Sequence, residues 1–240
     1  MSTIKAVVNE LFTRRYAYLF ICLLLPYVLH PLIETEVIGV TILDVAFTLV
    51  LIVAMFAMSD NRRFALPALV IMVIVQVCSW SANLTNSPMT QIVALGLNAL
   101  FMSYTVVYLL NRILTRETVT INTIFASLCV YLLIGYVWSF LYAILDLSVP
   151  GSFAIDNKLF QHVFDLSQVF SKLYYFMYYS FTTLTSLGLS DIMAANPTAR
   201  VLTVLEAIMG QLYLVVLVSR LISIHITQAT TRPKKKVDVV

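Results

Sequence analysis

The chain has 240 residues, of which 60% are hydrophobic and 11% are charged, and its mean hydropathy is +0.92. Soluble domains are typically about 45–50% apolar and about 25% charged, so this composition excludes an ordinary soluble protein and predicts a polytopic membrane protein. We expect no second, soluble domain in a chain of this length. Three cysteines lie in apolar runs without metal-ligand spacing, and we interpret them as small hydrophobic residues.

Six apolar segments of about 20 residues, the length that a helix needs to cross a membrane, follow one another along the chain. They are approximately residues 16–34, 39–58, 64–82, 89–111, 120–145 and 199–226. The first contains Pro26, His30 and Pro31 and is not followed by a small-residue cleavage site, so we interpret it as a helix rather than a signal peptide. A shorter element, residues 172–184, is predicted to be re-entrant. The predicted fold is an all-α membrane protein with six transmembrane helices, a re-entrant pore helix and a filter loop.

The distribution of basic residues predicts the orientation of these helices. Twelve of the 15 Lys and Arg residues lie near the two chain ends or in the second and fourth connections. They are Lys5, Arg14, Arg15, Arg62, Arg63, Arg112, Arg116, Arg220, Arg232, Lys234, Lys235 and Lys236. Only Lys158, Lys172 and Arg200 lie on the other side. Because basic loops remain in the cytoplasm, both termini are predicted to be cytoplasmic and the loop after residue 184 to face outward.

The most informative motif runs from Tyr178 to Asp191 and reads YYSFTTLTSLGLSD. Its last six residues resemble the potassium-channel selectivity filter, usually Thr-Val-Gly-Tyr-Gly-Asp, because Gly188 and Asp191 are identical and Ser186 keeps a hydroxyl group. The string from Arg200 to Leu214 also resembles the inner helices of the bacterial two-helix pore family. The resemblance covers about residues 120–228, whereas the first four segments match no specific pattern.

The resemblance implies a cation pathway that is lined by the backbone carbonyls of the filter. A dehydrated cation needs replacement oxygens, and alternating signs of φ, which glycine tolerates best, turn the carbonyls to one side. Leu189 stands in place of the usual aromatic residue and Ser190 in place of the second glycine, so we expect altered outer sites and weaker discrimination between K+ and Na+. K+ is the expected permeant ion, Na+ is the alternative, and no other cofactor is expected. The expected ion-binding residues are Thr185, Ser186, Leu187, Gly188, Leu189 and Ser190.

Four residues are expected to support the filter. In the family, the carboxylate at Asp191 bonds to an aromatic donor on the pore helix, where Tyr178 and Tyr179 stand here. The alternative is that Asp191 is a solvated charge at the outer mouth. Glu206 is expected to accept hydrogen bonds from the pore helix or from a neighbouring subunit.

The last segment is expected to line the inner pore. The resemblance places the inner-helix hinge at Gly210, 22 residues after Gly188. Helical spacing together with the resemblance then gives four apolar residues that face the axis. They are Leu214, Val218, Ile222 and Ile226.

The chain is predicted to have three parts: four helices in residues 1–116, a pore domain in 117–228 and a basic cytoplasmic tail in 229–240. One pore element cannot enclose an axial pathway, so a homotetramer is predicted. Residues 89–111 contain no Lys or Arg, so this segment is not expected to sense voltage. The expected partners are further copies of the chain and membrane lipids, and nucleic acid is not expected. Residues Arg232 to Lys236 either bind anionic lipid or form a solvated anchor.

The leading hypothesis is a potassium-channel-like cation channel in the plasma membrane of a prokaryote. Two alternatives remain open: a weakly selective or sodium-permeable channel, and a non-conducting homologue that acts as a membrane assembly or regulatory protein. An enzyme is not expected, because the sequence lacks H-E-x-x-H and G-x-S-x-G motifs and its three histidines, His30, His162 and His225, are dispersed.

Overall fold

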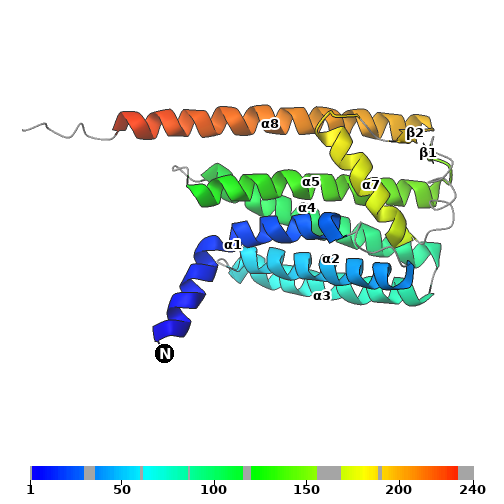
Figure 1. Ribbon diagram of the computed structural model, residues 1–240, viewed down its shortest axis with the longest axis horizontal. Coiled ribbons are helices and arrows are strands. Elements are labelled where there is room, and N and C mark those ends of the chain that lie inside the picture. The colour runs from blue at the N-terminus through cyan, green and yellow to red at the C-terminus, as the bar shows by residue number, and fades with distance from the viewer. Residues whose placement is uncertain are drawn as a thin grey trace, which may run out of the picture.

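The computed structural model describes residues 2–29, 36–59, 62–85, 87–115, 120–155, 169–188 and 191–231. Within these ranges the chain forms long helices, one shorter helix and two short strands (Figure 1). They are α1 (Ser2–Leu29), α2 (Glu36–Met58), α3 (Arg62–Thr85), α4 (Pro88–Thr115), α5 (Ile121–Ser148), β1 (Phe153–Ile155), α7 (Val169–Leu184), β2 (Ile192–Ala194) and α8 (Pro197–Thr231). The predicted all-α membrane class is confirmed.

Among the described residues, four helices are long and apolar enough to cross a membrane, namely Phe64–Ala82, Pro88–Thr115, Ile121–Ser148 and Pro197–Arg220. In α1 and α2, the residues with described side chains give two shorter apolar helices, Arg15–Leu29 and Val45–Met58. The prediction of six spanning helices is therefore supported for the last four and stays a prediction for the first two.

Local capping explains where the long helices α5 and α8 begin. Thr120 precedes α5 and forms a capping box with Thr123, in which each hydroxyl oxygen accepts the backbone N–H of the other residue. Asn196 precedes α8, and its Oδ1 accepts the N–H of Ala199 at 2.7 Å. Pro197 takes the first position of α8, where a missing N–H costs nothing.

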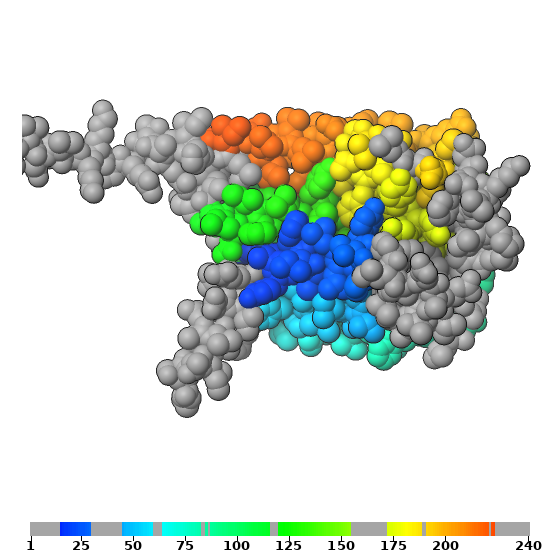
Figure 2. Space-filling model, viewed as in Figure 1, coloured from blue at the N-terminus to red at the C-terminus, as the bar shows by residue number. Residues whose placement is uncertain are grey.

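Helix α5 is the centre of the packing. It contacts α1, α4, α7 and α8, and its Tyr136, Phe140 and Tyr142 are among the largest fully buried side chains. In the most apolar part of each spanning helix, 61% of the residues of α5 are buried, compared with only 11% in α3 and in α8. Helices α3 and α8 are therefore the outer edges of the single chain. Figure 2 shows α8 as an outer layer over α5 and α7.

The hydrophobic core is continuous across residue 116, where the sequence predicted a boundary. Leu109 and Ile113 on α4 belong to the same buried cluster as Val130 and Leu133 on α5. The division between residues 1–116 and 117–228 therefore does not coincide with a break in packing, and it stays a prediction.

The segment between α5 and α8 is folded back on itself. Helix α7 is inclined to the long helices, its C-terminal end meets α8, and the chain then returns to β2 at the end of the molecule where α7 begins (Figure 1). Strands β1 and β2 pair antiparallel, with Phe153 opposite Ala194. The sequence did not predict this pair, since strands of three residues are too short to show an alternating pattern.

Candidate functional site

The loop after α7 begins with a helix cap of the Schellman type. The N–H groups of Leu187 and Gly188 both bind the carbonyl oxygen of Thr182, at 2.8 and 3.1 Å, and the Ser186 N–H binds Thr183 O at 2.9 Å. Ser186 has a φ of 57° and Gly188 a φ of 66°. Leu187, between them, is not among the positive-φ residues, so residues 186–188 alternate in the sign of φ as a filter of backbone carbonyls requires.

The left-handed conformation of Ser186 is unusual for a residue with a Cβ atom and costs on the order of 1 kcal/mol. Residues 185–188 are all exposed in the single chain, and the apolar side chain of Leu187 is 61% exposed. The predicted outer-filter residues Leu189 and Ser190 lie outside the described residues.

Gly210 allows α8 to approach the start of this loop. A Cβ atom at residue 210 would lie 2.3 Å from the carbonyl oxygen of Leu184, the last residue of α7. The same carbonyl oxygen accepts a hydrogen bond from the Tyr131 hydroxyl of α5 at 3.1 Å. Helix α8 continues without a break through Gly210, so the structure gives this glycine a packing reason, and its role as a hinge stays a prediction.

Glu206 on α8 is completely buried behind α7. Its carboxyl group forms hydrogen bonds with the hydroxyl groups of Tyr142 on α5 and Ser180 on α7, and Ser180 Oγ also lies 2.8 Å from Gly135 O. A serine has one hydroxyl proton, so Ser180 donates to only one of these two oxygens at a time. The three contacts, Tyr142 with Glu206, Ser180 with Glu206 and Ser180 with Gly135 O, can be hydrogen bonds at the same time only when Glu206 carries a proton and donates it to Ser180 Oγ.

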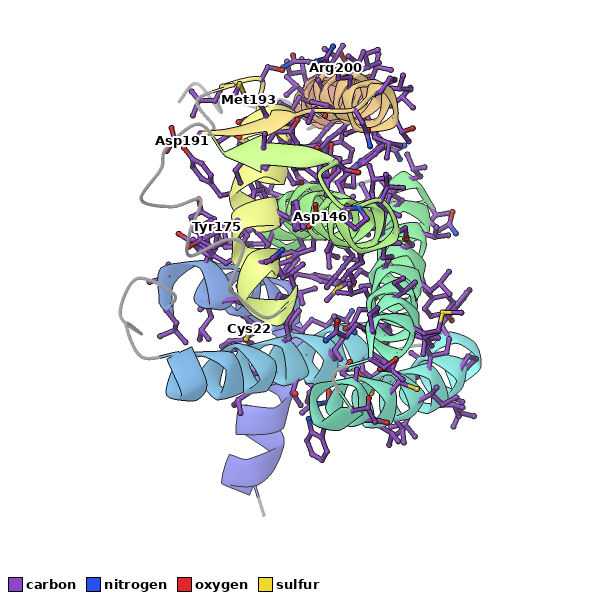
Figure 3. The ribbon with its side chains drawn as sticks, turned by 90° about the vertical axis from the view of Figure 1, so that its right-hand side faces the viewer. Cys22, Asp146, Tyr175, Asp191, Met193 and Arg200 are labelled. Carbon is purple, nitrogen blue, oxygen red and sulfur yellow. The ribbon has the colours of Figure 1, made fainter. Side chains whose placement is uncertain are left out.

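The two tyrosines that were expected to support the filter differ in their surroundings. Tyr179 is buried, and its hydroxyl shares a hydrogen bond with Thr203 Oγ1 on α8 at 2.7 Å. Its described hydrogen bond therefore runs to α8 and not to Asp191. Tyr178 is half-buried, while Asp191 is exposed and lies at the edge of the molecule (Figure 3). Both expectations for Asp191, a bond to the pore helix and a solvated charge at the outer mouth, stay predictions.

Beyond Gly210, α8 contacts the loop and α5 through polar side chains. Gln211 Nε2 donates to Ser186 Oγ at 2.9 Å, and the Tyr213 hydroxyl donates to Ser127 O at 2.7 Å. Of the predicted pore-lining residues, Leu214 is half-buried, while Val218 and Ile222 are 50% and 55% exposed. The side chain of Ile226 lies outside the described ones.

Sequence reasoning identified the loop and Glu206 but missed several of their partners. They are Tyr131, Gly135, Tyr142, Ser180 and Gln211. Polar residues within apolar helices were the available signal, since such residues pair with one another inside a membrane.

Comparison with known proteins identifies this region. Residues 153–226 match the protein family described as "Ion channel". This segment is therefore similar to ion-channel domains, as its resemblance to a potassium-channel pore predicted. The match begins at β1 and continues through α7, the loop, β2 and most of α8. No curated protein and no solved structure matches the chain significantly.

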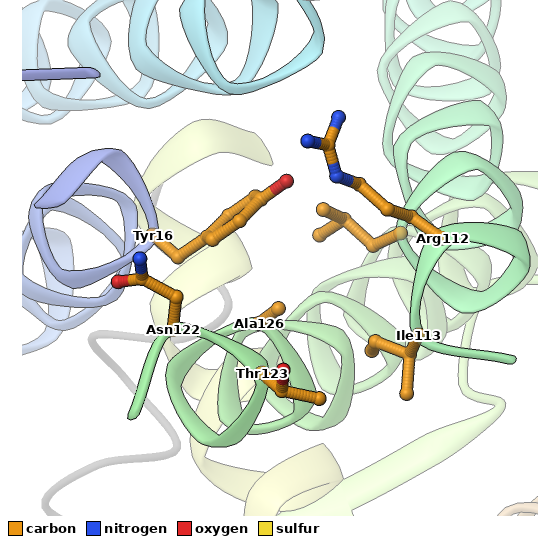
Figure 4. Close-up of a pocket in the computed structure, with 7 residues that line it drawn as sticks. Tyr16, Arg112, Ile113, Asn122, Thr123 and Ala126 are labelled. Carbon is orange, nitrogen blue, oxygen red and sulfur yellow. The ribbon is translucent and has the colours of Figure 1, made fainter. Parts of the chain in front are cut away.

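A small hollow lies away from the filter, near the start of α5. It is bordered by Tyr16 on α1, Arg112 on α4 and Asn122 on α5 (Figure 4). Arg112 donates to the Tyr108 hydroxyl at 3.0 Å, and its guanidinium lies 5.9 Å from the centre of the Tyr16 ring. The contact between Arg112 and Tyr16 joins the end of α4 to α1, and neither residue contacts the loop after α7 through a hydrogen bond given above.

Proposed function

We propose that four copies of the chain assemble around one axis and that their filter loops conduct monovalent cations passively, with K+ preferred over Na+. The observation that carries this proposal is the loop after α7, where a capped re-entrant helix leads into alternating signs of φ at residues 186–188 beside Gly210. One such loop cannot surround an ion, whereas four loops around an axis can.

The surface of α8 supports assembly. Only 11% of its spanning segment is buried, and exposed residues such as Val204, Ile208 and Leu212 cover several of its faces. In a tetramer this helix would contact neighbouring copies and line the pathway past Leu214, Val218, Ile222 and Ile226. The match of residues 153–226 to an ion-channel family favours transport over catalysis.

Opening of the proposed channel does not depend on voltage sensing by α4. The described part of this helix carries one basic residue in its last turn, Arg112, and that residue contacts Tyr108. Moving one charge through the membrane field supplies about 2.3 kcal/mol per 100 mV, so a helix without charges in its apolar part gains no such energy.

Ion flux in liposomes tests the proposal. Purified protein should pass K+, and reversal potentials in mixed K+ and Na+ should show a preference for K+. A Gly188→Val variant should lose flux because valine is strained at a φ of 66°, whereas Gly96→Ala should keep it because nothing lies within 4 Å of the added Cβ.

Each alternative gives a different result in this assay. Similar permeation of both ions would favour the weakly selective channel, which the replacements at Leu189 and Ser190 suggest. No flux in wild type, with flux restored by Leu189→Tyr and Ser190→Gly together, would favour a non-conducting homologue. A stable monomer would contradict the assembly.

The proposed orientation places both termini in the cytoplasm and the β1–β2 end outside. Cysteines introduced at Ser2 and at exposed Pro150, in a chain without its natural cysteines, should react with an impermeant reagent from opposite sides. Reaction from the same side would contradict the orientation.

The basic residues from Arg232 to Lys236 lie outside the described residues, and we propose from the sequence that they bind anionic lipid headgroups. Replacing the four basic residues by glutamine should weaken any dependence of flux on anionic lipid. Unchanged lipid dependence would leave the solvated anchor as the explanation.

A further inference from the structure

The hydroxyl groups at the inner end of the filter loop are not equivalent. Thr185 Oγ1 donates to Phe181 O within α7 at 2.7 Å, so this hydroxyl is engaged by the helix. Ser186 Oγ instead accepts a hydrogen bond from Gln211 Nε2 on α8 at 2.9 Å. Ser186 is therefore the residue whose hydroxyl oxygen reaches beyond α7, and Gln211 is the side chain that engages it.

The position of Gln211 is set by its neighbour in the sequence. The absence of a side chain at Gly210 lets α8 approach Leu184 O, which brings residue 211 close to the loop. Both Gln211 and Ser186 are exposed in the single chain. Their hydrogen bond thus lies on a surface that further copies of the chain or the pathway itself would cover.

We infer that Gln211 is a specificity-determining residue of the proposed cation pathway: its amide N–H binds Ser186 Oγ and limits how strongly that oxygen coordinates a cation. This inference rests on the proposed function. A serine oxygen has two lone pairs, and the amide N–H occupies one of them. The partial positive charge of the N–H group also opposes a cation at the same oxygen.

Weaker coordination at this site has a functional consequence. Conduction requires that an ion binds strongly enough to enter a filter and weakly enough to leave it. With Gln211 in place, an ion at the inner end is held mainly by backbone carbonyls and exits readily. Without the amide, no N–H group competes for the Ser186 oxygen, which then coordinates the ion more strongly, and exit slows.

The test compares single-channel conductance and the K+ concentration that gives half-maximal conductance. Gln211→Met keeps the length of the side chain but lacks a donor. It should lower the half-saturating K+ concentration by about two- to tenfold, the range that one neutral hydrogen bond supplies, and lower the maximal conductance. Gln211→Met should have no further effect in a Ser186→Ala background, where the hydroxyl is absent.

Two further variants complete the design. Gln211→Asn keeps the amide but is one methylene shorter, so it should reproduce the effect of Gln211→Met while remaining polar enough for assembly. Leu69→Met makes a similar change at an exposed residue of α3, outside the loop and α8, and should leave both quantities at their wild-type values.

The results separate this inference from the proposed function. A conducting wild type whose Gln211 variants keep the wild-type K+ dependence would overturn the role of Gln211 alone. An equal effect of Gln211→Met with and without Ser186 would also overturn it, because the amide would then act elsewhere. A wild type that passes no cation would overturn the proposed function and this inference with it.

Discussion

Two regions of the molecule are stabilised by different kinds of contact: the pore segment, which comprises α5, α7 and α8, and the first four helices, α1 to α4. In the pore segment, α5, α7 and α8 are joined by directional hydrogen bonds that meet at Glu206, Leu184 O and Thr203. Among the described side chains of α3 and α4, Asn98 donates to Ser79 in a buried hydrogen bond, and apolar residues of both helices, such as Val75 and Phe101, belong to the hydrophobic core.

This difference follows from what each region has to position. Apolar packing is non-directional, so it does not by itself fix the position of an individual polar atom. In the proposed function the loop after α7 coordinates an ion and needs fixed oxygen positions, and hydrogen bonds with defined lengths and angles supply that restraint. The proposed function gives the first four helices no such coordinating loop, so the same substitution should have different consequences in the two regions.

The largest contrast is expected for Gly→Ala at Gly210 and Gly96. At residue 210 the added methyl group lies 2.3 Å from Leu184 O, which belongs to the backbone and cannot turn away. Overpacking typically destabilises a protein by about 1–3 kcal/mol, and Gly210→Ala should reach at least the upper end of that range. We therefore expect this variant to lose flux or assembly. Gly96→Ala adds a methyl group where nothing lies within 4 Å and favours the helix by about 1 kcal/mol.

Size-exclusion profiles and liposome flux check this pair. If both variants assemble and conduct like wild type, the close approach of α8 to α7 is not essential for the filter. If Gly96→Ala is as damaging as Gly210→Ala, the contrast between the two regions fails.

The next largest effect is expected at Glu206. Glu206→Ala removes the acceptor of the buried Tyr142 hydroxyl, and an unsatisfied group of this kind costs about 1–3 kcal/mol, whereas Ser180 still donates to Gly135 O. Glu206→Gln should be well tolerated, because a carboxamide donates to Ser180 and accepts from Tyr142 just as a protonated carboxyl group does. Thermal unfolding measures the stability of the two variants, and the K+/Na+ permeability ratio measures their selectivity.

An equal loss in Glu206→Gln and Glu206→Ala would mean that Glu206 acts as a carboxylate, contrary to the arrangement of hydrogen bonds. Asn98→Ala is the matched change in the first four helices. It removes the bond to Ser79, and we expect it to lower the melting temperature without changing the permeability ratio. Measured bonds of this kind in membranes average about 0.6 kcal/mol, so this shift should be small.

Filter chemistry gives a third test. Leu189→Tyr with Ser190→Gly restores the residues that the filter of the family usually has, and should raise the K+/Na+ permeability ratio several-fold. The reason is that glycine removes the cost of a positive φ and tyrosine adds a hydrogen-bonding group behind the filter. An unchanged ratio, with wild type already excluding Na+, would show that the departures from the family do not loosen the filter.

The sequence predicted the features that depend on nearby residues. The length of apolar runs predicted the long helices, the short run at 172–184 predicted a helix close to α7, and the Gly188 motif located the loop. These signals are local. The length of an apolar run and a glycine in a loop each depend on one short stretch of sequence and not on its contacts with other segments.

Apart from a contact of Glu206 with the pore helix or a neighbouring subunit, the sequence did not predict contacts between distant segments. Tyr142 and Glu206 are 64 residues apart, Tyr131 and Leu184 are 53 apart, and Ser186 and Gln211 are 25 apart. Which polar side chains meet depends on helix rotation and tilt, which apolar patterning leaves open in a helix that is hydrophobic on all sides. The same reason explains why Gly210 was assigned a hinge from the resemblance, while its close contact with Leu184 O emerged only in three dimensions.

The smallest expected effect compares one chemical change, Tyr→Phe, in the two regions. Tyr179→Phe removes the hydrogen bond to Thr203 that joins α7 to α8, and Tyr104→Phe removes the bond to Phe64 O that joins α4 to α3. Each bond contributes on average about 0.6 kcal/mol in a membrane, so both variants should fold and their melting temperatures should differ little. Only Tyr179→Phe should lower the K+/Na+ permeability ratio, because only α7 carries the filter. Equal ratios in the two variants would mean that α7 is positioned by packing alone, and the directional bonds around Glu206 would then stabilise the pore segment without shaping the loop.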